Sequence, residues 1–172
     1  MIHNETKAEQ TKERGANLFR LFVYGTLKRG YWNHDTYCRS AISVEEATVR
    51  GRLYELPSAI PVMLVPDDDI LAVGSDRILD DILRQDTAAV PGEGRLLDDW
   101  DEVHGELITF ADPAAMEDID RLEGFRPDRP CLYRRVLVLV TTANTPAQPA
   151  WCYVQGVPPS RTIIPLGKCS WP

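Results

Sequence analysis

The stretch that most constrains the fold runs from Leu18 to Gly30 and reads Leu-Phe-Arg-Leu-Phe-Val-Tyr-Gly-Thr-Leu-Lys-Arg-Gly. Its first part is rich in aromatic and other β-favouring residues, which predicts a buried strand over 18–24. A short loop bracketed by Gly25 and Gly30 follows at once. Glycine lets a chain turn so that N–H groups that have left a strand converge on one anion. We therefore expect a strand that ends in an anion-binding loop.

The anion is not expected to be a nucleotide or a nucleic acid. The spacing of Gly25 and Gly30 resembles the start of a P-loop, but Tyr31 and Trp32 follow where that motif needs Lys and then Ser or Thr. The chain has 19 Lys and Arg against 26 Asp and Glu, a net charge of -7. Binding to nucleic-acid phosphates needs clustered positive charge, so this balance argues against such a surface.

Length and composition indicate one globular domain. A chain of 172 residues suits a single domain at 18–172, and the polar segment 1–17 is predicted to be a flexible extension. Neither a long apolar run nor a secretory signal is present, so we expect a cytoplasmic protein that does not enter membranes. The cysteines are widely spaced and form no C-x-x-C pair, which is typical of reduced packing residues rather than zinc ligands or disulfides. They are Cys38, Cys131, Cys152 and Cys169.

Four further strands are predicted from alternating or β-rich residues. They are Val49–Leu56, Val103–Phe110, Tyr133–Thr141 and Ala150–Val157. The first two share the spacing V-x-G-x-L, which favours two similar strands of one curved sheet. The last two are predicted to form an antiparallel hairpin. The segment 35–47 is predicted to hold a short helix and a turn, and the tail 158–172 to be irregular coil.

Residues 57–102 are predicted to be mostly loop, because prolines and acidic runs interrupt them. A short helix is expected over 75–85, with its apolar residues on one side. These apolar residues are Ile78, Leu79, Ile82 and Leu83. The acidic runs 67–69 and 98–102 lack the spacing and the glycine of an EF-hand, so we expect solvated loops and no metal site.

The clearest helix begins after Asp112, an N-cap residue followed by Pro113, and ends before Gly124. Its apolar stripe comprises Ala115, Met116, Ile119 and Leu122, and its outward positions are assigned to Glu117, Asp118, Asp120 and Arg121. Glu123 lies four residues after Ile119 and therefore falls within the stripe.

Two interpretations of Glu123 remain open at this point. In the first, the carboxylate is structural and turns to water or pairs with Arg134 or Arg135. In the second, it points into a cavity. A helix C-terminus and apolar neighbours both disfavour the anion, so they would raise the pKa of Glu123 towards the range useful for proton transfer.

Other nucleophiles and bases are few. The chain has three histidines, of which His34 is near the loop and is expected to be hydrogen-bonded rather than catalytic. Cys38 has no evident base or positive neighbour, so it is assigned to packing.

The order and spacing of several motifs resemble the gamma-glutamylcyclotransferase-like family, and the loop is most similar to its gamma-glutamylamine cyclotransferase branch. The motifs are Tyr24-Gly25-Thr26-Leu27-Lys28-Arg29-Gly30 with Asn33-His34, then Leu122-Glu123-Gly124 and Leu132-Tyr133-x-Arg135. The resemblance covers 19–56, 103–141 and 150–157. It implies an α+β fold, a small mixed β-barrel flanked by helices. The segment 66–101 would then be an insertion that reshapes or covers the site.

The resemblance also implies an activity. The α-amino group of a γ-glutamyl compound attacks its own γ-carbonyl, which yields 5-oxoproline and a free amine or amino acid without a cofactor. Glu123 would be the catalytic acid and base, and Tyr24, Gly25, Thr26 and Leu27 would bind the substrate. Tyr133 and Arg135 would support the pocket.

Three functions therefore remain in view. The first is a cyclotransferase acting on a small γ-glutamyl amine or peptide. The second is an enzyme of the same kind that removes a γ-glutamyl group from a biosynthetic intermediate, so that only the leaving group differs. The third is a non-catalytic module on the same fold that binds a small carboxylate or a protein partner. An occluded cavity, or a buried ion pair between Glu123 and Arg135, would favour the third.

Overall fold

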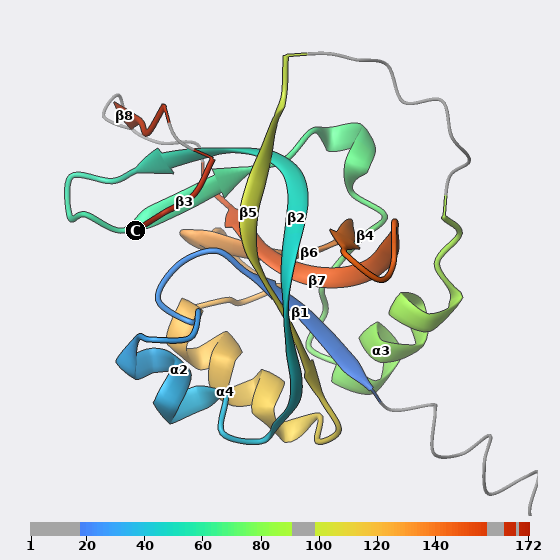
Figure 1. Cartoon of the computed structure of the whole chain (residues 1–172). Helices are drawn as coiled ribbons and strands as arrows, with labels where there is room; N and C mark the ends of the chain where they lie inside the picture. The colour runs from blue at the N-terminus through green and yellow to red at the C-terminus, as the bar shows by residue number, and fades with distance from the viewer. Residues whose placement is uncertain (1–17, 91–98, 158–163, 168) are drawn as a thin grey trace, which may run out of the picture.

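The structure, a computed structural model, describes residues 18–90, 99–157, 164–167 and 169–172 (Figure 1). The predicted extension 1–17 lies outside the described residues. The strands are β1 (Phe19–Val23), β2 (Ala41–Glu55), β3 (Pro61–Leu64), β4 (Ala72–Val73), β5 (Asp101–Phe110), β6 (Tyr133–Thr142), β7 (Gln148–Gln155) and β8 (Ile164–Pro165). The helices are α2 (Trp32–Tyr37), the 3-10 helix η1 (Asp67–Asp69), α3 (Ile78–Thr87) and α4 (Ala114–Glu123).

Five strands close into a barrel in the order β2-β5-β1-β7-β6. The barrel closes where β6 pairs again with β2, at Ala47 opposite Thr142 and Thr48 opposite Thr141. Strands β1 and β7 are parallel, whereas the other neighbours are antiparallel, so the barrel is mixed. Strand β3 extends the sheet beside β2 and β4 extends it beside β6. The predicted fold class, a small mixed β-barrel flanked by helices, is confirmed.

Strand β1 is buried on both faces. Phe19, Leu21 and Val23 pack in a cluster that also contains residues of α3 and α4. Phe22 packs in a second cluster, made mainly by strand residues, which fills the barrel. A strand covered on both faces has no position for a polar residue facing water, and this explains its nearly continuous apolar sequence.

The two strands that share V-x-G-x-L are direct neighbours. Strand β2 pairs with β5 in antiparallel register, with Ala47 opposite Gly105. A Cβ atom at Gly105 would collide with the Val23 carbonyl oxygen and the Phe22 ring, so only glycine lets β5 approach β1 this closely. The hairpin predicted near the C-terminus is confirmed as β6 paired with β7.

Helix α4 begins and ends as its sequence predicts. The Asp112 carboxylate accepts a hydrogen bond from the Ala114 N–H at 2.9 Å, as an N-cap does. At the other end Gly124 has a φ of 67°, which glycine adopts without strain. The Phe125 N–H donates to the Asp120 carbonyl at 2.9 Å and the Gly124 N–H to that of Arg121 at 3.3 Å, a Schellman motif. The motif fixes Glu123 as the last residue of the helix.

Three predicted boundaries are wrong. Strand β2 begins at Ala41 rather than Val49, because its first half pairs with β5 even though it carries Glu45 and Glu46. The short helix expected within 35–47 lies earlier, at Trp32–Tyr37. Part of the tail predicted to be coil forms β8, which pairs with β2.

The predicted apolar face of α3 is correct for Ile78 and Ile82, which pack in the core, but wrong for Leu79 and Leu83. Leu79 and Leu83 are 64% and 62% exposed, whereas Asp81, Ile82 and Gln85 are buried. Polar partners determine which face of α3 is buried. The Gln85 amide donates to the Leu18 carbonyl and accepts from the Arg20 N–H, each at 2.9 Å. These bonds attach α3 to the start of β1.

The segment 66–101 is more ordered than expected. Its described residues form η1, β4, α3 and the start of β5. Asp69, predicted to lie on a solvated loop, is 4% exposed and pairs with Arg50 at 2.9 Å. No set of described residues has the His, Cys, Asp and Glu needed to hold a metal ion. Among the described helices, none is long and apolar enough to cross a membrane.

Candidate active site

A cavity of about 350 Å³ lies where the loop after β1 meets the end of α4. Its polar and aromatic floor is formed by Phe22, Tyr24, Gly25, Thr26, Asn33, Tyr133 and Tyr153. Its apolar wall is formed by Val23, Leu27, Ala59, Ile60, Pro61, Leu122 and Leu132, and Glu123 completes the lining. Of the predicted site residues, the cavity thus brings together Glu123, Tyr24, Gly25, Thr26, Leu27 and Tyr133. Arg135 does not line it.

The loop that follows β1 is held by helix α2. The Asn33 amide donates to the Thr26 hydroxyl at 2.8 Å. The His34 Nδ1 contacts the Leu27 carbonyl oxygen at 2.8 Å. A carbonyl oxygen only accepts, so Nδ1 carries the proton and His34 is occupied in holding the loop. The interpretation of His34 as a hydrogen-bonded residue agrees with this contact.

The N–H groups of the loop are available to a ligand. The hydrogen bonds among the described residues include one from the Lys28 N–H to the Gly25 carbonyl at 3.0 Å, which closes the turn. They include none from the N–H groups of Gly25, Thr26 or Leu27. Adjacent N–H groups in a tight turn form a concave site for an anion. The loop can therefore bind a carboxylate without a charged side chain.

Two tyrosines fix the shape of the floor. The Tyr24 hydroxyl donates to the Tyr153 carbonyl at 2.9 Å and accepts from the Met63 N–H at 3.2 Å. The Tyr133 hydroxyl donates to the Pro61 carbonyl at 2.6 Å. Burial raises the pKa of both phenols, so they stay neutral. Their hydroxyls are used in holding β1, β6 and β7 against β3, and their rings face the cavity.

Among the described residues that line the cavity, Glu123 is the one with an acidic side chain. The pKa of Glu123 is raised to about 7, mainly by burial and to a smaller extent by the nearby Asp120 carboxylate. The Glu123 carboxylate forms no ion pair or hydrogen bond with any described residue. A carboxylate with this pKa gains and loses a proton readily near neutral pH.

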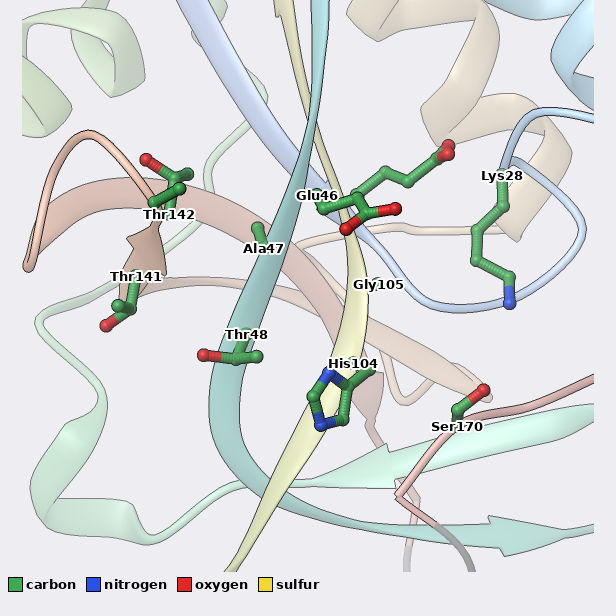
Figure 2. A pocket seen from close by; sticks show the side chains of 11 residues that line it. Lys28, Glu46, Ala47, Thr48, His104, Gly105, Thr141, Thr142 and Ser170 are labelled. Atoms are coloured by element: carbon green, nitrogen blue, oxygen red, sulfur yellow. The ribbon is translucent and has the colours of Figure 1, made fainter.

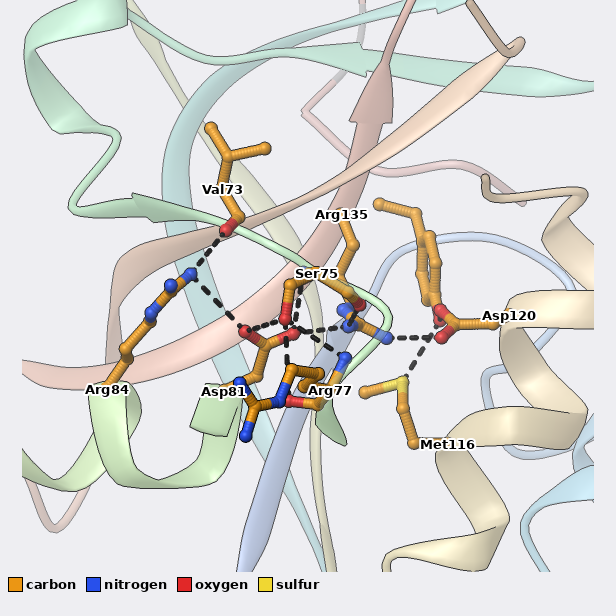
Figure 3. Close-up of polar contacts among 9 residues, drawn as sticks. Val73, Ser75, Arg77, Asp81, Arg84, Met116, Asp120 and Arg135 are labelled. Carbon is orange, nitrogen blue, oxygen red and sulfur yellow. Dashed lines mark hydrogen bonds and ion pairs between the residues drawn. The ribbon is translucent and has the colours of Figure 1, made fainter. Parts of the chain in front are cut away.

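Arg135 is instead fully buried behind the cavity, so its expected contact with substrate needs correction. Its guanidinium bonds to the carboxylates of Asp120 and of Asp81, the latter at 2.5 Å, and to the Ser75 carbonyl at 2.8 Å (Figure 3). It also stacks over the Phe125 ring, with 4.9 Å to the ring centre. Arg135 therefore joins α3 to α4 and neutralises the buried carboxylate of Asp81 and the partly buried carboxylate of Asp120.

Asp120 is the residue of this network that sequence reasoning misplaced. The sequence places Asp120 on the outward face of α4, whereas its carboxylate accepts from the Tyr153 hydroxyl at 2.5 Å as well as from Arg135. A signal was present: Asp120 follows Met116 by four residues and so shares the face of a residue assigned to the apolar stripe. Asp81 carried no such signal, because its partner is 54 residues away.

The described part of the insertion does not cover the site. None of residues 66–90 or 99–101 lines the cavity. The expectation that this segment reshapes or covers the pocket is therefore wrong for its described residues. Its contribution is Asp81, which reaches Arg135 from α3.

A larger groove of about 590 Å³ lies elsewhere on the barrel (Figure 2). It is lined by Lys28 and by polar residues of β2, β5 and β6, including Glu46, Thr48 and His104. The Lys28 ammonium donates to the Trp171 carbonyl at 2.6 Å. None of the predicted site residues lines this groove, so the smaller cavity is the candidate active site.

The cysteines add no second candidate. All four are free thiols, and burial raises the pKa of Cys38 to about 12, which suppresses its thiolate. Cys38 and Cys152 are buried packing residues as expected, whereas Cys169 is exposed.

The class of protein follows from comparison with known families. The model of the GGACT family, described as gamma-glutamyl cyclotransferase, AIG2-like, matches residues 21–85 and 81–171. The chain belongs to this family. Among curated proteins, none matches the sequence significantly.

Solved structures show the same fold at low sequence identity. An AIG2-like protein from Mus musculus is 20% identical, with a TM-score of 0.52, and the match covers 83% of this chain and 80% of that one. A protein from Arabidopsis thaliana is 17% identical, with a TM-score of 0.51 and coverage of 83% and 73%. YkqA from Bacillus subtilis is 22% identical with a TM-score of 0.51, and the match covers 90% of this chain but only 39% of YkqA.

Proposed function

We propose that this chain is a gamma-glutamyl cyclotransferase in which Glu123 is the general acid and base. The observation that carries the proposal is the position of Glu123, whose carboxylate has a pKa of about 7 and pairs with none of the described residues. It lies in the same cavity as the N–H groups of Gly25, Thr26 and Leu27, which bond to no described acceptor. General acid–base groups work best when their pKa lies near the operating pH.

The loop binds the substrate. Its N–H groups receive the α-carboxylate of the γ-glutamyl group, which needs no counter-cation in the protein. Held at this end, the substrate folds so that its α-nitrogen approaches its own γ-carbonyl carbon. Fixing this geometry makes ring closure favourable, because the orientational entropy is lost on binding rather than in the reaction.

Glu123 moves the proton. An α-ammonium group has no lone pair and cannot attack, so the Glu123 carboxylate removes one proton first. The α-nitrogen then forms a bond to the γ-carbon, and the bond from that carbon to the amide nitrogen breaks. Glu123 returns this proton to the departing nitrogen and then accepts the second proton, which the α-nitrogen loses as it becomes the lactam N–H. That second proton passes to the free amine, which leaves as an ammonium ion. The products are 5-oxoproline and a free amine, and the atoms balance without water, metal or redox cofactor.

The non-catalytic alternative is not favoured by the geometry. An occluded cavity, or an ion pair between Glu123 and Arg135, would favour a non-catalytic module. Among the described residues, Arg135 pairs with Asp81 and Asp120 instead, and rim residues such as Ile60 and Leu132 are partly exposed. The leaving group is the part of the substrate that this mechanism leaves open.

The test is release of 5-oxoproline from a set of γ-glutamyl donors by the full chain. Glu123→Gln keeps the shape of the side chain but not its basicity, and we expect a loss in kcat/KM of at least about 100-fold. Glu117→Gln is the matched control, because Glu117 is exposed on the same helix. Equal 5-oxoproline release by wild type and Glu123→Gln would contradict the proposed role of Glu123. Failure of every donor would contradict the proposed activity.

A further inference from the structure

The loop after β1 has two sides. Gly25, Thr26 and Leu27 line the candidate active site, whereas Lys28 lines the larger groove. The N–H groups of the first three residues bond to no described acceptor, so they do not help to hold the loop in one conformation. A glycine-bracketed loop that presents such N–H groups to a ligand needs support from its surroundings to keep them in place.

Two supports for this loop come from regular elements. Helix α2 bonds to Thr26 and Leu27 through its side chains. On β5, the Glu106 carboxylate accepts from both the backbone N–H and the Nε of Arg29, each at 2.8 Å. The Lys28 side chain, which lies between these residues, bonds to neither element.

A third support comes from the segment 169–172, which lies beside β5 just past the point where β1 leaves it. Strand β1 ends opposite Glu106. Closer to the start of β5, the His104 N–H donates to the Cys169 carbonyl at 2.7 Å. In the same segment, Trp171 is partly buried against the cluster that fills the barrel. The segment is thus fixed to the barrel independently of the loop.

Trp171 makes two contacts with the loop. Its carbonyl oxygen accepts from the Lys28 ammonium at 2.6 Å, and Figure 2 shows Lys28 on the same side of the larger groove as Ser170. The indole ring of Trp171 packs on the Tyr31 ring, with 5.5 Å between the ring centres. The Lys28 ammonium lies 6.0 Å from the centre of the Tyr31 ring. These three side chains form one cluster behind the loop, and none of them lines the candidate active site.

We propose that Lys28 and Trp171 are positioning residues that hold the loop in the conformation that binds the γ-glutamyl carboxylate. They act from behind the loop and do not touch the substrate. The inference rests on the proposed function, because it assigns the loop N–H groups to that carboxylate. The carboxylate does not react during ring closure, so the loop binds the substrate and the transition state alike. Loss of the support should therefore raise KM more than it lowers kcat.

Amide hydrogen exchange, resolved by residue with NMR, tests this support without any substrate. The reporters are the N–H groups of Lys28, Arg29 and Tyr31, which are hydrogen-bonded in the folded loop. In Trp171→Ala we expect them to exchange about three- to tenfold faster, because the variant loses one aromatic pair that opposes local opening.

Three further variants make the test specific. Trp100→Ala is the matched control, because Trp100 is also partly buried but its ring contacts Arg52 rather than the loop. Trp171→Phe keeps an aromatic ring against Tyr31 and should restore slow exchange. Lys28→Met removes the ammonium and leaves the packing of Trp171 on the barrel, so it tests the support even if Trp171→Ala fails to fold. It should speed exchange of the other two reporters by about threefold or more.

The kinetics of 5-oxoproline release connect the support to the substrate. In Trp171→Ala we expect KM to rise by about three- to tenfold while kcat changes by less than about twofold. The pH at which kcat/KM rises should stay that of wild type, because Glu123 is held by α4 and not by the loop. A shift of that pH would place the effect at α4 and overturn the inference.

The two measurements separate this inference from the proposed function. Unchanged exchange in Trp171→Ala and Lys28→Met overturns the inference, whatever the activity. Faster exchange with an unchanged KM overturns the role of the two residues in binding substrate. If no donor yields 5-oxoproline but exchange is faster in both variants and not in Trp100→Ala, the proposed function is overturned and the support of the loop stands.

Discussion

Replacing Asp120 by Asn should shift the pH dependence of the enzyme to lower pH. Asp120 precedes Glu123 by one helical turn, and its negative charge is the second cause, after burial, that raises the pKa of Glu123. Asn keeps the shape of the side chain: its carbonyl oxygen still accepts from Arg135, and its NH2 group takes the place of the oxygen beside Tyr153 and donates to that hydroxyl, which can accept. The substitution therefore removes a charge while preserving the contacts that hold α4.

The magnitude follows from the two causes. The pKa of Glu123 rises from 4.5 to about 7, and burial contributes the larger share. Two carboxylates one helical turn apart, about 6 Å, repel by roughly 3 kcal/mol at an effective dielectric constant of 20. The Arg135 guanidinium beside Asp120 offsets part of this repulsion. We expect a shift of about one pH unit, or about 1.4 kcal/mol.

The sign is determined by the role of Glu123. The base must be unprotonated in the free enzyme, so kcat/KM rises as the pH increases through its pKa. In Asp120→Asn this rise should occur at lower pH, and the excess positive charge left on Arg135 acts in the same direction.

The assay is kcat/KM for 5-oxoproline release between pH 5 and pH 9, with thermal unfolding measured alongside to verify the fold. Asp118→Asn is the matched control, because Asp118 is on α4 but pairs with Arg121 at the surface. If kcat/KM of Asp120→Asn rises at the same pH as that of wild type, or at a higher pH, the coupling between Asp120 and Glu123 is refuted. If the pH of this rise shifts equally in Asp118→Asn, the shift is due to the change in the protein's net charge rather than to Asp120.

Two further predictions concern stability. Because the pKa of Glu123 is higher in the folded protein than in the unfolded chain, the folded state binds more protons between pH 4.5 and about 7, and this group destabilises the fold as the pH rises. Glu123→Gln should therefore increase the free energy of unfolding at pH 8 by about 1–3 kcal/mol and have little effect below pH 4.5. Urea unfolding at both pH values measures this difference. An equal effect at both pH values would exclude the link between the Glu123 pKa and stability. Arg135→Met should lower the free energy of unfolding by about 3–5 kcal/mol, because it leaves the Asp81 and Asp120 carboxylates buried without their cation. Adding Asp81→Asn and Asp120→Asn should recover part of this loss in the same measurement, and no recovery would mean that packing of the guanidinium dominates.

Local rules predicted the elements that local sequence controls. The cap at Asp112, the glycine after Glu123 and the apolar stripe of α4 all act within a few residues, and the structure agrees with them. The same holds for the strands β1, β5, β6 and β7, whose residues are apolar on one face or both. The loop after β1 and Glu123 could be singled out for the same reason, since each is visible in one short stretch, and the structure places both in the lining of one cavity.

Elements chosen by a distant partner could not be predicted in this way. The first half of β2 carries Glu45 and Glu46 and is a strand because β5 pairs with it. Helix α3 buries Asp81 and Gln85 and exposes Leu79 and Leu83, because Arg135 and the start of β1 bind its polar face. Amphipathic periodicity assigns buried positions to apolar residues, so it fails where buried polar residues have dedicated partners.

The hydrogen bonds of Arg135 link α4, which local sequence predicts, to α3, whose buried face depends on distant partners. A buried carboxylate at Asp120 requires a cation, and Arg135 is held in place in turn by Asp81 of α3 and by the Phe125 ring beyond the end of α4. The last turn of α4 is therefore bonded on one side to the insertion and closed on the other by the Schellman motif. A proton-transfer group at a helix end needs such support, because a helix terminus otherwise frays and an error of about 1 Å in position costs much of the rate. The insertion thus contributes to the site by holding the helix that carries Glu123, while the turn between β2 and β3 lines the cavity.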